Sequence, residues 1–173
     1  MQQFILERVR VSGLYGSASE YIRDLVRGDY EREDARKVAW VVDTCLLLDI
    51  GLDDRKFAAD SEHLLWDKLA EGLLVCPVTF VELAPAFSGE VEALGEFLFQ
   101  LGVDSQESWM PTDTRTACEA WARHVERRHS HQAAKRPIAD VLIGAFAQRF
   151  QGLLTRNTSD FRRLFPQLRM IEP

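Results

Sequence analysis

The sequence has few cysteines, and none of them are paired. Its three cysteines, Cys45, Cys76 and Cys118, lie far apart without a C-x-x-C pair, so we expect reduced thiols and neither a disulfide framework nor a zinc knuckle. No apolar run approaches the roughly 18 to 20 residues of a membrane span. Charged residues among the first ten positions interrupt the apolar stretch that a signal peptide needs. A cytoplasmic protein is the expectation.

Motifs of several enzyme classes are also missing. The chain has neither a Walker loop nor a G-x-G-x-x-G sequence, and no Ser or Cys stands at a recognisable nucleophile elbow. His124, His129 and His131 do not show the helical pairing beside a third ligand that a zinc site requires. These absences disfavour nucleotide-binding folds, acyl transfer and zinc chemistry.

The charge is acidic on average but is segregated along the chain. The 173 residues are 46% hydrophobic, which is the size and composition of one domain with a sizeable core, and carry a net charge of −6. Residues 44–114 contain 14 acids and 3 bases, whereas residues 115–169 contain 11 bases and 4 acids. The negative net charge is therefore compatible with a basic face that binds phosphates.

From residue 38 onward, short apolar runs alternate with helical patterns. Expected strands are 38–42, 73–76, 152–155 and 168–171, with 108–110 as a brief edge strand. Expected helices are 61–71, 80–86, 90–101, 114–128, 139–150 and 160–165. Continuous apolar strands indicate burial on both faces. The alternation predicts an α/β fold with a doubly wound parallel sheet, in which ligands bind beyond the carboxyl ends of the strands.

Residues 1–37 have a different pattern. Ser17 and Glu20 fit a capping box, which predicts a helix beginning there. Tyr21, Leu25 and Val26 belong to its apolar stripe, and a shorter helix is expected to end at Gly13. A helical hairpin of this size has no core of its own. We therefore expect its stripe to cover either the domain of residues 38–173 or a second copy of the chain.

Three carboxylates follow predicted strands or begin predicted helices. Asp43 directly follows the first strand, Glu82 is expected in the first turn of the next helix, and Asp140 is the only acid in an apolar helix that starts after Pro137. Each alone could be an ordinary cap or first-turn acid. If the three carboxylates converge, their negative charges repel one another. The simplest group that would neutralise this repulsion is a bound divalent cation, Mg²⁺ or Mn²⁺.

Polar residues also follow the strand at residues 152–155. Thr155 and Asn157 lie just past its end, where a hydroxyl and an amide can orient water or a ligand carboxylate. Asp160 is either a helix cap or a metal contact. The sequence alone leaves both roles open.

Four segments together resemble a known family. They are Val-Val-Asp43-Thr44, Pro-Val-Thr-Phe-Val-Glu82-Leu, Arg136-Pro-Ile-Ala-Asp140-Val-Leu-Ile-Gly and Leu-Thr155-Arg-Asn157-Thr-Ser-Asp160-Phe. In this order and spacing they resemble the PIN-domain ribonucleases, in particular the VapC-like toxins of type II toxin–antitoxin pairs, over about residues 38–173. The resemblance implies a three-layer α/β/α fold with about five parallel strands. It also implies hydrolysis of RNA phosphodiester bonds, a cognate antitoxin and a homodimer.

The resemblance also implies roles for individual residues. Asp43, Glu82 and Asp140 match the three core acids that would bind Mg²⁺ or Mn²⁺, and Asp160 would be a fourth catalytic acid. Thr44, Thr155, Asn157 and Arg136 would position the ligands and the RNA. Many members of the family carry Asp where this chain has Asn157. Whether Asp160 substitutes for that acid, and whether one or two metal ions bind, therefore stays open.

Residues 1–37 resemble the helical part of a ParD-like ribbon-helix-helix antitoxin, through the segment Val-Ser-Gly13-Leu-Tyr-Gly16-Ser-Ala-Ser-Glu20-Tyr-Ile-Arg23. No strand of the kind that enters the DNA major groove in that family precedes Met1, so we expect no binding to operator DNA. Three interpretations of this segment stay open. It is an antitoxin remnant fused to a toxin, it is an inhibitor of the nuclease, or the assigned start lies upstream of a toxin that begins near Val38.

Two other classes compete with the nuclease. A PIN-like scaffold silenced by its attached helices would be a binding or regulatory module. A phosphoacceptor receiver domain is disfavoured, because the sequence shows no adjacent acid pair and no Lys at a late strand end.

Overall fold

The chain divides into two compact units, residues 1–37 and residues 38–173. The structure is a computed structural model that describes residues 17, 19–27, 38–130 and 137–173, without the side chains of residues 128–130. In the first unit, residues 19–27 form a helix, as predicted. The Glu20 N–H donates to the Ser17 hydroxyl at 3.2 Å, which is one arm of the capping box. The expected helix before Gly13 lies outside the described residues.

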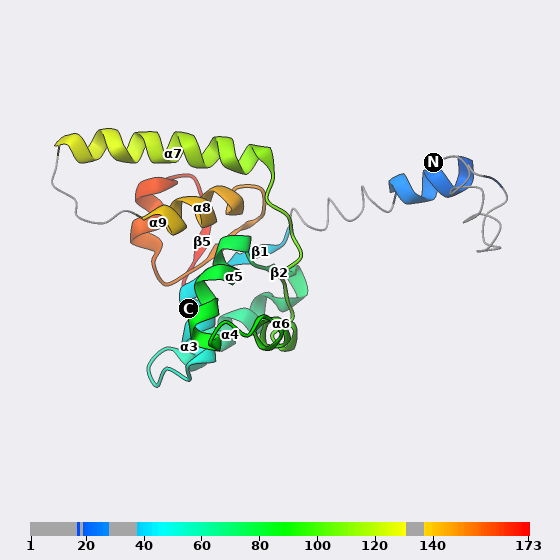
Figure 1. Cartoon of the computed structure of the whole chain (residues 1–173), viewed down its shortest axis with the longest axis horizontal. Coiled ribbons are helices and arrows are strands. Elements are labelled where there is room, and N and C mark those ends of the chain that lie inside the picture. Colours follow the sequence, from blue (N-terminus) through cyan, green and yellow to red (C-terminus); the bar gives the residue numbers. More distant parts are fainter. Residues whose placement is uncertain (1–16, 18, 28–37, 131–136) are drawn as a thin grey trace. The chain divides into compact units, whose positions relative to one another are not determined.

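The second unit is built on a five-stranded sheet in which every pair of neighbouring strands is parallel. The strands are β1 (Trp40–Val42), β2 (Leu73–Leu74), β3 (Val103–Asp104), β4 (Gly152–Leu154) and β5 (Met170–Ile171). Their order is β3-β2-β1-β4-β5, and Val41 pairs with Leu74 on one side and Leu153 on the other. The predicted α/β class with a parallel sheet is confirmed (Figure 1). The order reverses at β1, so β1 is central.

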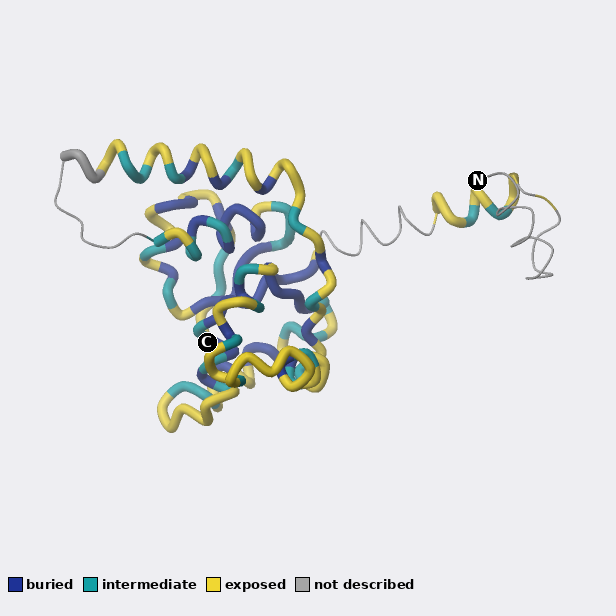
Figure 2. Tube along the Cα trace, viewed as in Figure 1, coloured by how far each residue is buried: buried dark blue, intermediate teal, exposed yellow. Residues whose placement is uncertain are grey.

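Helices cover both faces of this sheet. They are α3 (Thr44–Gly51), α4 (Ala58–Lys68), α5 (Pro77–Leu83), α6 (Val91–Gln100), α7 (Pro111–Ser130), α8 (Ile138–Ala147) and α9 (Thr158–Leu164), with short 3-10 turns at Leu69–Glu71 and Ala84–Phe87. Side chains of α7, α8 and α9 pack in one core with Val41 of β1, while side chains of α3, α4 and α6 pack in a second core with Trp40 and Val42. Figure 2 shows the buried chain between these two layers. The arrangement is consistent with a three-layer α/β/α fold.

One predicted strand is wrong and one helix was missed. The edge strand beside β2 is β3, not residues 108–110. Instead of pairing with a strand, Ser108 accepts a hydrogen bond on its carbonyl from the Arg149 guanidinium at 2.8 Å. The helix α3 was not predicted, because its run of apolar residues does not alternate with polar ones at helical spacing.

Helices that begin with proline start earlier than predicted. Pro77 is the first residue of α5 and Pro111 is the first residue of α7, where we expected starts at residues 80 and 114. Proline suits this position because its φ angle is already helical and its missing N–H would have had no partner. The shift at α5 matters for the site, because it moves Glu82 from the first turn of the helix to the last.

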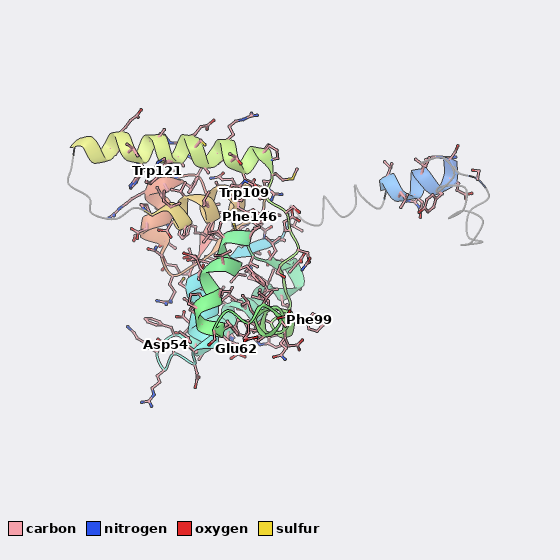
Figure 3. The ribbon with its side chains drawn as sticks, in the orientation of Figure 1. Asp54, Glu62, Phe99, Trp109, Trp121 and Phe146 are labelled. Atoms are coloured by element: carbon pink, nitrogen blue, oxygen red, sulfur yellow. The ribbon has the colours of Figure 1, made fainter. Side chains whose placement is uncertain are left out.

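The tryptophans serve mainly as packing residues. Trp40 is fully buried, and Trp109 stacks on Phe146 with 6.3 Å between ring centroids (Figure 3). Trp66 is the exception, with 66% of its surface exposed. Within the described ranges, no helix is long and apolar enough to cross a membrane.

Candidate functional site

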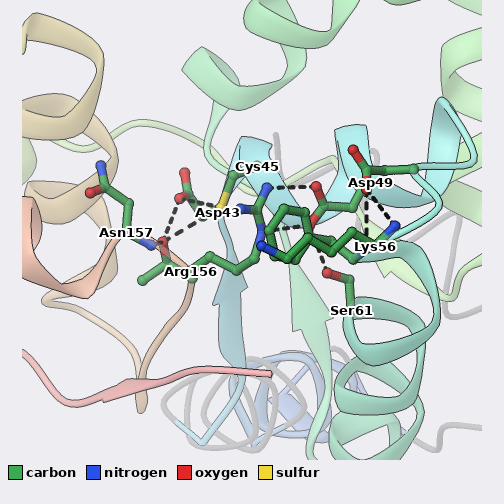
Figure 4. A network of polar contacts seen from close by, with 10 residues as sticks. Asp43, Cys45, Asp49, Lys56, Ser61, Arg156 and Asn157 are labelled. Atoms are coloured by element: carbon green, nitrogen blue, oxygen red, sulfur yellow. Dashed lines mark hydrogen bonds and ion pairs between the residues drawn. The ribbon is translucent and has the colours of Figure 1, made fainter.

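The candidate site lies at the carboxyl ends of β1 and β4. These strands are neighbours in the sheet, and the residues that follow them, Asp43 and Thr155, come into contact. The Asp43 N–H donates to the Leu154 carbonyl at 3.0 Å, which continues the sheet pairing up to the acid. Figure 4 shows the side chains gathered here. Because strand order reverses at β1, this is the edge where an open parallel sheet forms a crevice for ligands.

Asp43 occupies the N-cap position of α3, but its side chain makes no capping hydrogen bond. The carboxylate is buried, with 5% exposure, and one of its oxygens, Oδ2, accepts hydrogen bonds from the Thr155 hydroxyl at 2.6 Å and from the Cys45 thiol at 3.0 Å. The alternative reading of Asp43 as a helix cap is therefore right about its position but does not account for these two hydrogen bonds. Its carboxylate is held by side chains from two different elements.

Burial raises the pKa of Asp43 above its ordinary value, and the negative charge of Glu82 adds to that rise. The hydrogen bonds from Thr155 and Cys45 act in the opposite direction. Burial also raises the pKa of the Cys45 thiol to about 12, with the charge of Asp43 as the next cause. In this closed arrangement Cys45 is thus a neutral thiol that donates to Asp43.

Glu82 is exposed and lies in the last turn of α5. The hydroxyl of Thr44, the first residue of α3, donates to Glu82 Oε2 at 2.5 Å. The predicted position of Glu82 at a helix N-terminus is wrong, so the helix dipole does not stabilise its charge there. The structure nevertheless brings Asp43 and Glu82 together, because each is hydrogen-bonded to a threonine at the same edge of the sheet.

The other two acids begin their helices. Asp140 is half-buried in the first turn of α8, which packs against α5. Asp160 lies in the first turn of α9, and its carboxylate is 3.6 Å from the Arg163 guanidinium. The N-cap position of α9 belongs to Asn157, so Asp160 is not the cap. The Asn157 backbone N–H donates to the Thr155 hydroxyl at 2.9 Å, and Asn157 thus fixes the threonine that holds Asp43.

The donor chemistry of the site fits a hard divalent cation, although its carboxylates are few. Asp43 and Glu82 are like charges near each other, and Mg²⁺ is commonly bound through one or two carboxylates with water and substrate phosphates completing its shell. Among the described residues, no group of three or more His, Cys, Asp or Glu side chains is placed to hold a metal ion. The structure therefore does not gather Asp140 or Asp160 with this pair into one ligand cluster, and their role as ligands stays a prediction.

Three residues at or near this edge, Arg156, Asp49 and Cys45, were not singled out as site residues from the sequence. Arg156 forms two hydrogen bonds with Asp49 near the end of α3, from Nε to Oδ2 at 2.7 Å and from Nη2 to Oδ1 at 2.6 Å. Cys45 belongs to no recognisable motif. A signal for Asp49 did exist, since it is a lone acid in the apolar stretch after Cys45, the same feature that drew attention to Asp140.

The basic stretch of residues 115–169 is only partly described. Arg136, the predicted RNA-positioning residue, lies outside the described residues. Arg127, in the same stretch, donates from its guanidinium to the Arg163 carbonyl at 2.8 Å, which joins α7 to α9. Two cavities, of about 220 and 530 Å³, lie elsewhere, beside the exposed Phe99 of α6. Neither is lined by any of the predicted acids.

Fold and site together define a protein with an α/β fold and a five-stranded parallel sheet that carries a buried acid at the end of its central strand. Comparison with protein-family models, with curated proteins and with solved structures found no match.

Proposed function

We propose that this chain is a metal-dependent endoribonuclease, the toxin component of a toxin–antitoxin pair. The observation that carries the proposal is Asp43, a buried carboxylate at the carboxyl end of the central strand with the charge of Glu82 beside it. If no ligand bound beside Asp43, replacing this buried acid with a neutral residue would make the fold more stable. The resemblance of the chain's sequence to the VapC-like PIN-domain ribonucleases supports the same proposal.

In this proposal, Asp43 and Glu82 hold Mg²⁺ or Mn²⁺, and Asp140 joins them from the start of α8. The bound ion would lower the pKa of a water molecule and neutralise charge that develops on the phosphate. Thr155 and Cys45 fix one oxygen of Asp43, and Thr44 fixes Glu82. Preorganised carboxylates of this kind need little rearrangement when the ligand arrives. Asp160 serves as the fourth acid, and Arg136 and Asn157 help to position the RNA.

The proposal is tested with the full-length protein, a mixture of structured RNAs and a titration of Mg²⁺ or Mn²⁺. Asp43→Asn and Asp140→Asn should fold normally and lose cleavage. Glu92→Gln is the matched control, because Glu92 is also a first-turn acid, at the start of α6. Glu92→Gln should cleave like the wild type. Wild-type rates in both aspartate variants would show that the site is wrongly assigned.

A silent PIN-like binding module is the second candidate. It is favoured by one observation, that the described acids form no three-member cluster. The same titration separates the two functions, since metal binding without cleavage by the wild type supports the silent module and cleavage rejects it.

The partners follow from the same resemblance. We propose RNA as substrate, a homodimer, and a separate antitoxin protein, with residues 1–37 as a ParD-like segment that does not bind operator DNA by itself. A monomeric mass at micromolar concentration would contradict the homodimer.

A further inference from the structure

An ion pair links the far end of α3 to the segment that carries Thr155. Asp49 is buried, with 4% exposure, and its carboxylate accepts the two Arg156 hydrogen bonds and a third from the Ser61 hydroxyl at 2.8 Å. The Arg156 guanidinium lies over the Phe57 ring, 4.0 Å from its centroid. We call Asp49, Arg156, Ser61 and Phe57 the Asp49–Arg156 clamp (Figure 4).

The clamp uses the geometry that only arginine provides. A guanidinium can form two parallel hydrogen bonds with one carboxylate and stack on an aromatic ring at the same time, whereas a lysine ammonium cannot reproduce that planar arrangement. Ser61 and Phe57 both belong to the start of α4, so the side chain of Arg156 is fixed against two helices. The segment that follows β4 is therefore anchored through Arg156 to α3 and α4.

The segment 155–157 meets α3 at two points. Asp43 and Asp49 are six positions apart, which places them about 9 Å apart along the axis of α3. Thr155 and Arg156 are consecutive residues, and they bind Asp43 and Asp49 respectively. An attachment at each end of the helix leaves this segment little freedom to rotate, so the Thr155 hydroxyl stays directed at Asp43.

We propose that Arg156 is a positioning residue, which acts through the Asp49–Arg156 clamp to hold the Thr155 hydroxyl on Asp43. The catalytic consequence rests on the proposed nuclease function, whereas the structural consequence does not. If the clamp opens, segment 155–157 moves off Cys45, because the Cys45 sulfur lies 3.7 Å from the Thr155 hydroxyl oxygen and next to the Arg156 backbone N–H.

Alkylation of cysteine by a neutral reagent at one fixed pH gives a test that needs no RNA. The background is full-length Cys118→Ser, since Cys118 is exposed. Arg156→Ala and Arg156→Lys should each speed the labelling of Cys45 by about tenfold or more, because local opening now exposes it. The fully buried Cys76, distinguished by mass spectrometry, reports any general loosening and should stay unlabelled.

Arg149→Lys is the matched control. Like Arg156, Arg149 forms ion pairs with acids, Asp113 at 2.8 Å and Glu107 at 3.0 Å, and lies against aromatic rings. Arg149 differs in its position, because it precedes β4 whereas Arg156 follows β4. Arg149→Lys should leave the labelling of Cys45 at the wild-type rate. Equal labelling of Cys45 in all variants would overturn the clamp, and so would faster labelling of Cys45 and Cys76 together.

Cleavage kinetics then test the catalytic consequence. A misplacement of about 1 Å at a reacting group can cost about 100-fold in rate, so Arg156→Lys should lower kcat by about 10- to 100-fold with KM within about twofold. A change in KM alone would overturn the positioning role. Absence of cleavage by the wild type would refute the proposed nuclease function instead, and the labelling result would still decide whether the clamp holds segment 155–157.

Discussion

Replacing Thr155 with valine removes the strongest hydrogen bond to Asp43 while keeping nearly the same shape. Thr155 is fully buried, donates to Asp43 at 2.6 Å and accepts from the Asn157 N–H at 2.9 Å. A hydrogen bond to an ionised acceptor contributes about 1.5–3 kcal/mol, and leaving the Asn157 N–H without its acceptor adds about 1 kcal/mol. We therefore expect Thr155→Val to lower the free energy of unfolding by about 2–4 kcal/mol while Asp43 is ionised.

The size of this loss should depend on pH in a definite direction. The Thr155 hydrogen bond lowers the pKa of Asp43, although burial keeps that pKa above its ordinary value of 3.8. Without the bond the pKa rises further, so the folded variant takes up a proton at a higher pH than the folded wild type. The difference in free energy of unfolding between the two proteins is therefore largest where Asp43 is ionised in both folded proteins, and it shrinks as the pH falls through the two pKa values.

Urea unfolding followed by tryptophan fluorescence, to which the buried Trp40 contributes, measures both effects over a series of pH values. The matched control is Thr79→Val, a fully buried threonine in α5 whose hydroxyl has no hydrogen-bond partner among the described residues. Valine there should leave stability unchanged or raise it slightly. The reasoning is refuted if Thr155→Val costs no more than Thr79→Val, or if its cost does not fall toward acidic pH.

Three further changes have definite expected outcomes. Asp43→Asn removes a buried carboxylate whose pKa is raised, so it should stabilise the fold by about 0.5–2 kcal/mol where Asp43 is ionised, with the gain falling toward acidic pH in thermal melts. Gly144→Ala should destabilise by about 1–3 kcal/mol in urea, because its Cβ would lie 2.3 Å from the Phe165 ring, whereas Gly95→Ala in α6 meets nothing within 4 Å and should stabilise. Deleting residues 1–37 should reduce solubility but leave the melting temperature within about 4 °C and not raise cleavage; a large rise in cleavage would identify the segment as an inhibitor.

The sheet was largely predictable because its strands are short apolar runs. Such runs occur where both faces of a strand are buried, and four of the five strands lie within the predicted ranges. The strand β3 was not, because its second residue, Asp104, is polar and exposed, so that no continuous apolar run marks it. Residues 108–110 have an equally apolar pattern, but the carbonyl of Ser108 is bound by Arg149, a long-range contact that no local pattern reports.

The site was predictable to the extent that it follows from the strand ends. Placing Asp43 and Thr155 after neighbouring parallel strands brings them together, and their hydrogen bond confirms that expectation. The pairing of Asp49 with Arg156 could not be predicted in the same way, since it joins a helix end to a loop 107 positions away. Glu82 was placed in the wrong turn because Pro77 begins α5 earlier than the apolar pattern suggested.

The connection between Asp43 and Thr155 also sets the order in which the site can form during synthesis. The two residues are 112 positions apart, and β1 reaches β4 only after the first three strands and most of the helices have been made. At about 5–20 residues per second, a ribosome needs roughly 6–22 s to travel from one to the other. Until Thr155 has been made, no Thr155 hydroxyl is present to donate a hydrogen bond to Asp43. If the chain cuts RNA, it is therefore incompetent until Thr155 has been made.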